Sequence, residues 1–201
     1  MNNSCVILGA GHNGLAAACY LAKAGMQVTV IEKNSVYGGA AISTEIFPGI
    51  KAKLSRYSYL VALMPNEIKK ELDLNLELLS RTVSSFTPLG NKGLLVERNP
   101  GEITKDSFIE FTGSDVDFQN WITFYSRVEK IAQIIAPTLL KPLVSKEAIK
   151  KLIDQGDENA FRDFFEQPIG QTINESFVSD VVKGIVLTDA LIGTFTDGFD
   201  G

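Results

Sequence analysis

Three glycines near the start of the chain have the spacing of a turn that binds nucleotide phosphates. Gly9, Gly11 and Gly14 lie in the run GAGHNG, which follows an apolar run and opens a helical one. Gly9 allows a sharp turn, Gly11 has no side chain to block a pyrophosphate, and Gly14 lets the helix pack closely. The first N–H groups of that helix are free and lie at the positive end of its dipole. The pattern therefore predicts a dinucleotide site.

The residues between these glycines are expected to take part through their backbone. Ala10, His12 and Asn13 fill the turn, and His12 is the only histidine of the chain. We expect its amide rather than its imidazole to act. No second His or Cys lies at ligand spacing, so no metal site is predicted. No residue is assigned a catalytic role, because paired carboxylates, a nucleophile elbow and a Walker loop are all lacking.

An acid ends the next apolar run. Glu32 follows residues 28–31 and lies about 20 residues after the turn, where a carboxylate accepts hydrogen bonds from ribose hydroxyls. Lys33 lies beside it. A carboxylate repels a 2′-phosphate, so NADP is disfavoured while FAD and NAD both remain open.

A glycine pair then favours FAD. Gly38 and Gly39, followed by Ala40, come soon after the second apolar run. Flavoproteins that bind extended FAD often place a second close backbone approach there, whereas a dehydrogenase with one dinucleotide has no special need of it. A simple turn is the alternative interpretation.

The secondary-structure elements predicted around these residues indicate an α/β fold. We predict a Rossmann-type βαβ unit that binds FAD or NAD(P), with short β pieces, over residues 1–100, and a helix-rich substrate or cap region over 101–201. The first predicted strand ends at Leu8. The other predicted strands or short β pieces span 28–31, 43–48, 76–87, 92–98 and 107–111. The predicted helices span 13–24, 56–64, 66–73, 115–136, 145–153, 157–166, 169–176 and 178–192.

The predicted sheet is incomplete. A doubly wound dinucleotide domain needs further parallel strands, and no second crossover follows the first βαβ unit. We therefore expect the chain to be a fragment or a truncated reading frame.

Two apolar features are expected to be structural. The aromatic and aliphatic stripe of the long predicted helix is expected to be core, with a tunnel for a long apolar substrate as the alternative; its members are Phe118, Trp121, Ile122, Tyr125, Val128, Ile131, Ala132 and Ile135. Cys5 and Cys19 are expected to be small buried side chains. They do not form a closely spaced redox pair.

Composition and net charge limit the kinds of partner that the chain is expected to bind. The chain has 201 residues, a net charge of −5 and an isoelectric point near 5.0, which argues against nucleic acid bound through a basic face. No uninterrupted apolar window is long enough for a transmembrane helix. Without a signal or transit pattern, cytoplasm is the expected location, with mitochondria the alternative in a eukaryote.

Several segments resemble the phytoene-dehydrogenase-like FAD oxidoreductases. They are GAGHNGL (9–15), VIEKNSVYGGAA (30–41), SRYSYLVAL (55–63), SSFTPLG (84–90) and TDALIGTF (188–195). The resemblance implies FAD as the cofactor, with Gly9, Gly11 and Gly14 at its pyrophosphate. It implies that Glu32 contacts the adenosine ribose with Lys33 beside it, and that Gly38, Gly39 and Ala40 pass near the pyrophosphate and ribityl chain. Residues near Arg56 and Ser58 would approach the flavin or the substrate channel.

The resemblance predicts an oxidoreductase that removes hydride from a C–H bond of a small molecule, and an apolar substrate is compatible with it. In that family a second FAD-contacting segment lies near the C-terminus of a longer chain, and it is not found here. An NAD-dependent dehydrogenase and a non-catalytic nucleotide-binding or regulatory module remain the alternatives. The sequence leaves the oligomeric state open.

Overall fold

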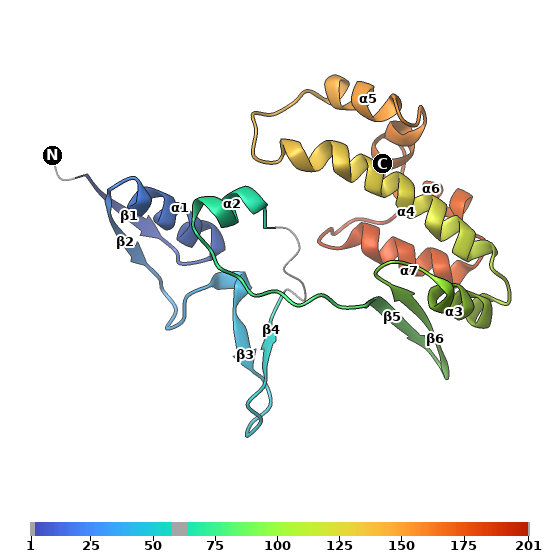
Figure 1. The fold of residues 1–201 in the computed structure, drawn as a ribbon, viewed down its shortest axis with the longest axis horizontal. Coiled ribbons are helices and arrows are strands. Elements are labelled where there is room, and N and C mark those ends of the chain that lie inside the picture. Colours follow the sequence, from blue (N-terminus) through green and yellow to red (C-terminus); the bar gives the residue numbers. More distant parts are fainter. Residues whose placement is uncertain (1–2, 58–63, 201) are drawn as a thin grey trace. The chain divides into compact units, whose positions relative to one another are not determined.

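The computed structural model describes residues 3–57 and 64–200, and it divides the chain into two units (Figure 1). The first unit is Met1–Leu78 and the second is Leu79–Gly201. The sequence predicted a boundary at residue 100. In the structure residues 79–100 belong with the second unit, because their hairpin packs on the helix that follows.

The first unit begins with the predicted βαβ arrangement. Strand β1 (Ser4–Leu8), helix α1 (His12–Lys23) and strand β2 (Gln27–Ile31) follow one another, and the two strands pair in parallel from Ser4–Gln27 to Leu8–Ile31. This is the Rossmann-type unit expected from the sequence. Its sheet has two strands in the described part of the chain, so apolar side chains stay open: Leu8 is 80% exposed.

Short elements complete the first unit. They are the 3-10 turn η1 (Gly39–Ala41), the antiparallel pair β3 (Ser43–Glu45) and β4 (Lys53–Ser55), and helix α2 (Asn66–Glu71). The predicted strand 43–48 is thus shorter and ends before Pro48, and the sequence did not reveal its partner β4. The predicted helix 56–64 lies mostly outside the described residues.

The second unit opens with a hairpin and a helix. Strands β5 (Val83–Leu89) and β6 (Lys92–Glu97) pair antiparallel, and α3 (Glu102–Thr112) follows. The backbone N–H of Leu95 donates to Ser107 Oγ at 2.8 Å, which ties α3 to β6. The predicted strand 107–111 is wrong, because this segment is the second half of α3. Thr104 and Phe108, one helical turn apart, are both buried on the side facing the hairpin.

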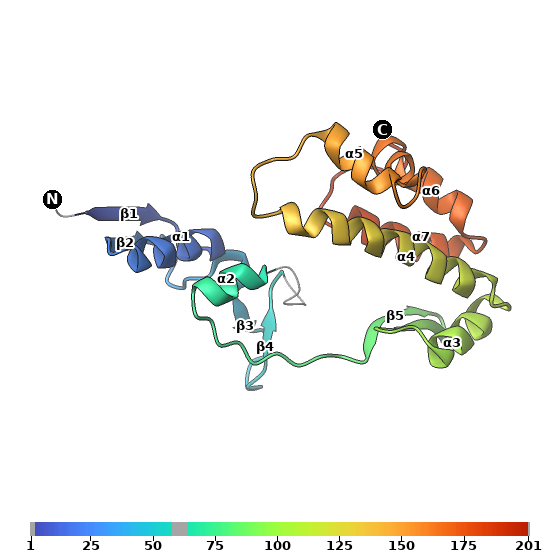
Figure 2. The same cartoon turned by 45° about the horizontal axis from the view of Figure 1, so that its top comes forward.

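Helices make up the rest of the second unit (Figures 1 and 2). They are α4 (Val116–Ile135), the 3-10 turn η2 (Ala136–Thr138), α5 (Lys146–Asp154), the π-helical turn η3 (Arg162–Glu166), α6 (Ile169–Ser176) and α7 (Asp180–Leu191). The predicted helices agree with these within a few residues, except that 157–166 contains the π-helical turn.

The stripe of α4 is mainly core. Trp121 and Phe118 are buried with Phe108, Ile173 and other side chains of one cluster, while Ile131 joins a second cluster beneath α5. Trp121 meets Phe108 edge-on, with 5.5 Å between ring centroids. The core interpretation is therefore confirmed for these members, whereas Ile122 is exposed.

Two further expectations can be compared with the structure. Cys5 is half-buried and Cys19 is exposed, so the expected burial of Cys19 is wrong for this structure. Helix α1 has no buried residue, because only two strands lie beside it in the described part of the chain. Among residues 3–57 and 64–200, no helix combines the length and the apolar character needed to cross a membrane.

Candidate dinucleotide site and a second hollow

The glycine turn has the close packing that its spacing predicted. Gly9 has a φ of +98°, and its N–H donates to Ile31 O at 2.7 Å, which fixes the turn to the end of β2. A Cβ placed on Gly14 would lie 2.1 Å from Gly9 O. Only glycine therefore allows α1 to start this close to the turn.

Gly11 is different, because the protein itself leaves room there. The nearest atom to a Cβ built on Gly11 is Gly39 Cα, at 4.0 Å. Gly11 occupies the cap position of α1 and has no side chain with which to cap it. The first N–H groups of α1 thus remain available for an anion at the positive end of the helix.

The glycine pair lies directly against this turn. The N–H of Gly38 donates to Ala10 O at 2.7 Å, and Gly11 and Gly38 form a parallel β-bridge. A Cβ on Gly39 would lie 2.9 Å from Gly11 Cα. The two glycine-rich segments predicted from the sequence therefore meet, and their contact leaves no space for a side chain at Gly39.

Glu32 joins the site through a bond that sequence reasoning did not foresee. Its Oε2 accepts a hydrogen bond from the N–H of Ala10 at 2.8 Å, and its Oε1 accepts from the backbone and side chain of Asn34 at 3.0 and 2.8 Å. The backbone bond from Asn34, followed by that from Ala10, lowers the pKa of Glu32 below its usual value. The carboxylate therefore stays ionised at neutral pH and holds the glycine turn. Oε1 already accepts two hydrogen bonds, whereas Oε2 retains a lone pair that can accept from a hydroxyl.

The other predicted residues surround this arrangement. His12 and Asn13 are exposed at the first turn of α1, Ala40 lies exposed in η1, and Lys33 is exposed after Glu32. Among the described residues, no group of three His, Cys, Asp or Glu side chains could hold a metal ion.

The weaker assignment near Arg56 and Ser58 cannot be followed in full. Arg56 is exposed and its guanidinium lies 5.6 Å from the ring centroid of Tyr57. Ser58 lies outside the described residues. The N–H of Arg56 donates to Ile42 O at 3.2 Å, and its proposed place near a flavin stays a prediction.

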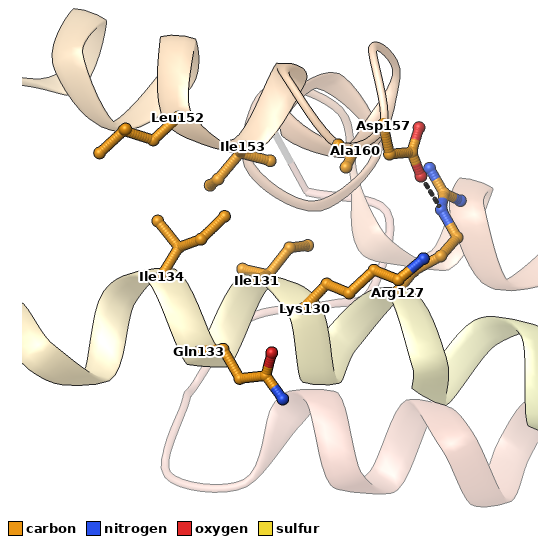
Figure 3. Close-up of a pocket in the computed structure, with 10 residues that line it drawn as sticks. Arg127, Lys130, Ile131, Gln133, Ile134, Leu152, Ile153, Asp157 and Ala160 are labelled. Atoms are coloured by element: carbon orange, nitrogen blue, oxygen red, sulfur yellow. Dashed lines mark hydrogen bonds and ion pairs between the residues drawn. The ribbon is translucent and has the colours of Figure 1, made fainter.

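The second unit contains a hollow of about 290 Å³ between α4 and α5 (Figure 3). Ile131 and Ile134 of α4 face Leu152 and Ile153 of α5 across it. This hollow was not predicted from the sequence. The helical spacing of the isoleucines was visible in the sequence, but it looked the same as ordinary core spacing.

An ion pair closes one end of this hollow. Arg127 Nε lies 2.5 Å from Asp157, and Arg127 Nη2 lies 2.6 Å from Asp163, which also pairs with Arg162 at 2.7 Å. Burial raises the pKa of Asp157, but the hydrogen bond from Arg127 and the charges of Arg127 and Lys130 outweigh it and lower that pKa. Asp157 is therefore charged at neutral pH.

Comparison with known proteins agrees with the Rossmann-type fold of the first unit. Residues 7–65 match the family described as the NAD(P)-binding Rossmann-like domain. An uncharacterized protein of Mycobacterium tuberculosis is 37% identical over 198 residues, which cover 94% of this chain and 37% of that protein. The pyridine nucleotide-disulfide oxidoreductase domain-containing protein 2 of Mus musculus is 30% identical over 220 residues, covering 95% of this chain and 37% of that protein.

A shorter match carries the resemblance seen in the sequence. The phytoene desaturase of Neurospora crassa is 58% identical over 36 residues, which are 18% of this chain and 6% of that protein. The chain spans 37% of the length of the two longer-matched relatives. The resemblance of the chain to oxidoreductases of this kind is thereby confirmed.

Proposed function

Because the chain is a relative of the pyridine nucleotide-disulfide oxidoreductase domain-containing protein 2 and has a dinucleotide-binding Rossmann-like fold, we propose that it binds FAD as part of an FAD-dependent oxidoreductase. The observation that carries this proposal is the contact between the two glycine segments. Gly38 bonds to Ala10 and bridges to Gly11, so a second backbone segment approaches the phosphate turn. A single turn would suit any dinucleotide, whereas two joined segments suit the longer FAD.

Each group of residues would bind a different part of the cofactor. Gly9, Gly11 and Gly14 with the start of α1 would bind the pyrophosphate, and the remaining lone pair of Glu32 Oε2 would accept from the adenosine ribose. Gly38, Gly39 and Ala40 would pass along the pyrophosphate and ribityl chain. In this scheme the protein binds and orients, and the flavin, when bound, supplies the capacity to accept hydride from a C–H bond. The short match to a phytoene desaturase supports dehydrogenation of a small molecule.

One observation favours a second candidate. The matching domain family is described by NAD(P) rather than by FAD, and Glu32 would serve the ribose of NAD equally well. An NAD-dependent dehydrogenase would bind NAD(H) tightly and retain no flavin. A nucleotide-binding module without catalysis would bind either cofactor and show no turnover with any electron acceptor.

The first test is to add FAD to the purified chain, desalt it and record the visible spectrum. We expect retained flavin absorbance. We then expect Gly11→Ala to weaken FAD binding at least tenfold, because the new methyl group enters the space left for the pyrophosphate, while the fold stays intact since no protein atom lies within 4 Å except Gly39 Cα at that limit. Binding is measured by flavin fluorescence and the fold by circular dichroism.

Two variants make this result specific. Gly14→Ala should lose binding together with the fold of the first unit, because its Cβ would lie 2.1 Å from Gly9 O. Gly184→Ala, on α7, should change neither, because its Cβ meets nothing within 4 Å. If Gly11→Ala binds FAD as the unaltered chain does, the FAD assignment is wrong. Tight NAD binding without flavin retention would favour the dehydrogenase.

A further inference from the structure

The hollow between α4 and α5 has a charged end and an apolar end. Arg127, Asp157 and Lys130 lie at one end, and Ile134 and Leu152 lie toward the other (Figure 3). The floor is formed by buried side chains, including Ile131 and Ile153. Such a division of polar and apolar groups is what an amphiphilic small molecule requires.

Counting the charges at the polar end leaves one cation over. Arg127 and Arg162 are matched by Asp157 and Asp163, with which they form ion pairs at 2.5 to 2.7 Å. Lys130 is exposed on the rim and makes no ion pair or hydrogen bond within the described part of the chain. The charge of Lys130 also acts on Asp157, and the cluster and Lys130 together carry one net positive charge, which complements a single anionic group.

The apolar end continues toward an exposed leucine-rich connection. Helix α4 leads from Ile134 into residues 136–145, and α5 returns from them to Leu152. In this connection Leu139 is 66% exposed and Leu143 is fully exposed. A volume of about 290 Å³ lies at the lower limit of small-molecule sites, so it suits one narrow chain better than a ring system.

We propose that this hollow binds a single-chain anionic amphiphile, with its carboxylate at Lys130 and its hydrocarbon chain between Ile134 and Leu152, over the floor formed by Ile131 and Ile153. The site lies within the second unit and shares no residue with the glycine turn. It is therefore independent of the proposed dinucleotide function, and either assignment can fail without the other.

The test is calorimetric titration of the full chain with decanoate, below its micelle concentration, alongside octanoate and decan-1-ol. We expect decanoate to bind about fifteenfold more tightly than octanoate, since each buried methylene contributes about 0.8 kcal/mol, or about fourfold in affinity. Decan-1-ol should bind more weakly than decanoate because it lacks the charge.

Variants locate the two ends of the ligand. Lys130→Gln should weaken decanoate about threefold to fivefold, as expected for a partly exposed ion pair, and should leave decan-1-ol unchanged. Leu152→Gln should weaken both ligands. Lys151→Gln is the matched control, because Lys151 is an exposed lysine next to Leu152 that does not line the hollow. Circular dichroism confirms that each variant is folded.

Each other outcome overturns the proposal. Absence of decanoate binding refutes the site. Equal affinity for decanoate and decan-1-ol, or no effect of Lys130→Gln, refutes an anionic ligand held at Lys130. Binding that Leu152→Gln does not weaken places the ligand elsewhere on the chain.

Discussion

The two units of the chain differ in how their residues are used. The first unit carries close backbone contacts at Gly14, Gly38 and Gly39, yet in its described residues Ala10 is the only hydrophobic residue that is buried. The second unit has two clusters of buried apolar side chains, built around Trp121 and Ile131. The first unit therefore carries the candidate site with almost no core, whereas the second unit contains the buried apolar core.

This contrast indicates where the stability of each unit comes from. Burial of apolar surface is the main favourable term in folding, so the second unit should unfold cooperatively by itself. The first unit, with apolar strand residues exposed, should gain much of its stability from what binds it.

The largest effect is expected in the core of the second unit. Trp121→Ala should lower its stability by about 3–5 kcal/mol, because it removes a buried aromatic side chain that contacts three other rings. The thermal midpoint, followed by circular dichroism, should fall by roughly 10 °C or more. Ile122→Ala on the same helix is the control, because Ile122 is exposed, and it should change the midpoint little. An unchanged midpoint for Trp121→Ala would revive the idea of an apolar tunnel.

The second effect concerns the first unit and its cofactor. FAD at 100 times its dissociation constant should stabilise the first unit by about 2.7 kcal/mol, and it should leave the second unit unchanged. Hydrogen exchange measured by mass spectrometry can follow the two units separately. Protection should rise in β1, α1 and β2 and stay constant in α4 and α7. Equal protection of both units would contradict the independence described above.

The third effect tests a buried polar contact in the second unit. Asp117 is buried in α4 and accepts hydrogen bonds from the N–H groups of Val178 and Ser179, both at 2.8 Å, just before α7. Asp117→Ala should cost about 1–3 kcal/mol because two partly buried backbone donors lose their charged acceptor. Asp117→Asn keeps one acceptor oxygen and should cost less. Urea denaturation measures both variants, and an unchanged midpoint for Asp117→Ala would show that water replaces the carboxylate.

Local patterns in the sequence were sufficient for the βαβ unit and most helices. The turn from Gly9 to Gly14 could be predicted because each glycine answers a local steric requirement, and Glu32 because it ends a strand at a known distance. The prediction of a strand at 107–111 was wrong because, over so short a segment, the apolar residues fit the helical period and the strand period equally well. The segment is a helix because Phe108 and Thr104, one helical turn apart, can then both pack against the hairpin.

The contacts between residues that are far apart in the sequence could not be predicted from local patterns. The contact of Gly39 with Gly11 depends on the path of the chain between Glu32 and Gly38, for which the sequence offers no periodic signal. The bond from Ala10 to Glu32 likewise joins residues that are 22 positions apart. The hollow beside Ile131 depends on how α5 returns along α4, and the spacing of the isoleucines does not distinguish a filled interface from an open one.

The smallest effect is the response of the first unit to acid. Hydrogen bonds from Asn34 and Ala10 place the pKa of Glu32 below its ordinary value of 4.5, so the folded turn favours the carboxylate. A lowered pKa adds stability above the ordinary value, and this is lost as pH falls through the folded pKa. FAD affinity should therefore be constant from pH 7 through the ordinary value of 4.5 and should fall only at lower pH, as the folded Glu32 becomes protonated. Glu32→Gln should bind more weakly throughout, with no such fall. If the unaltered chain and Glu32→Gln lose affinity in parallel, another group controls the turn.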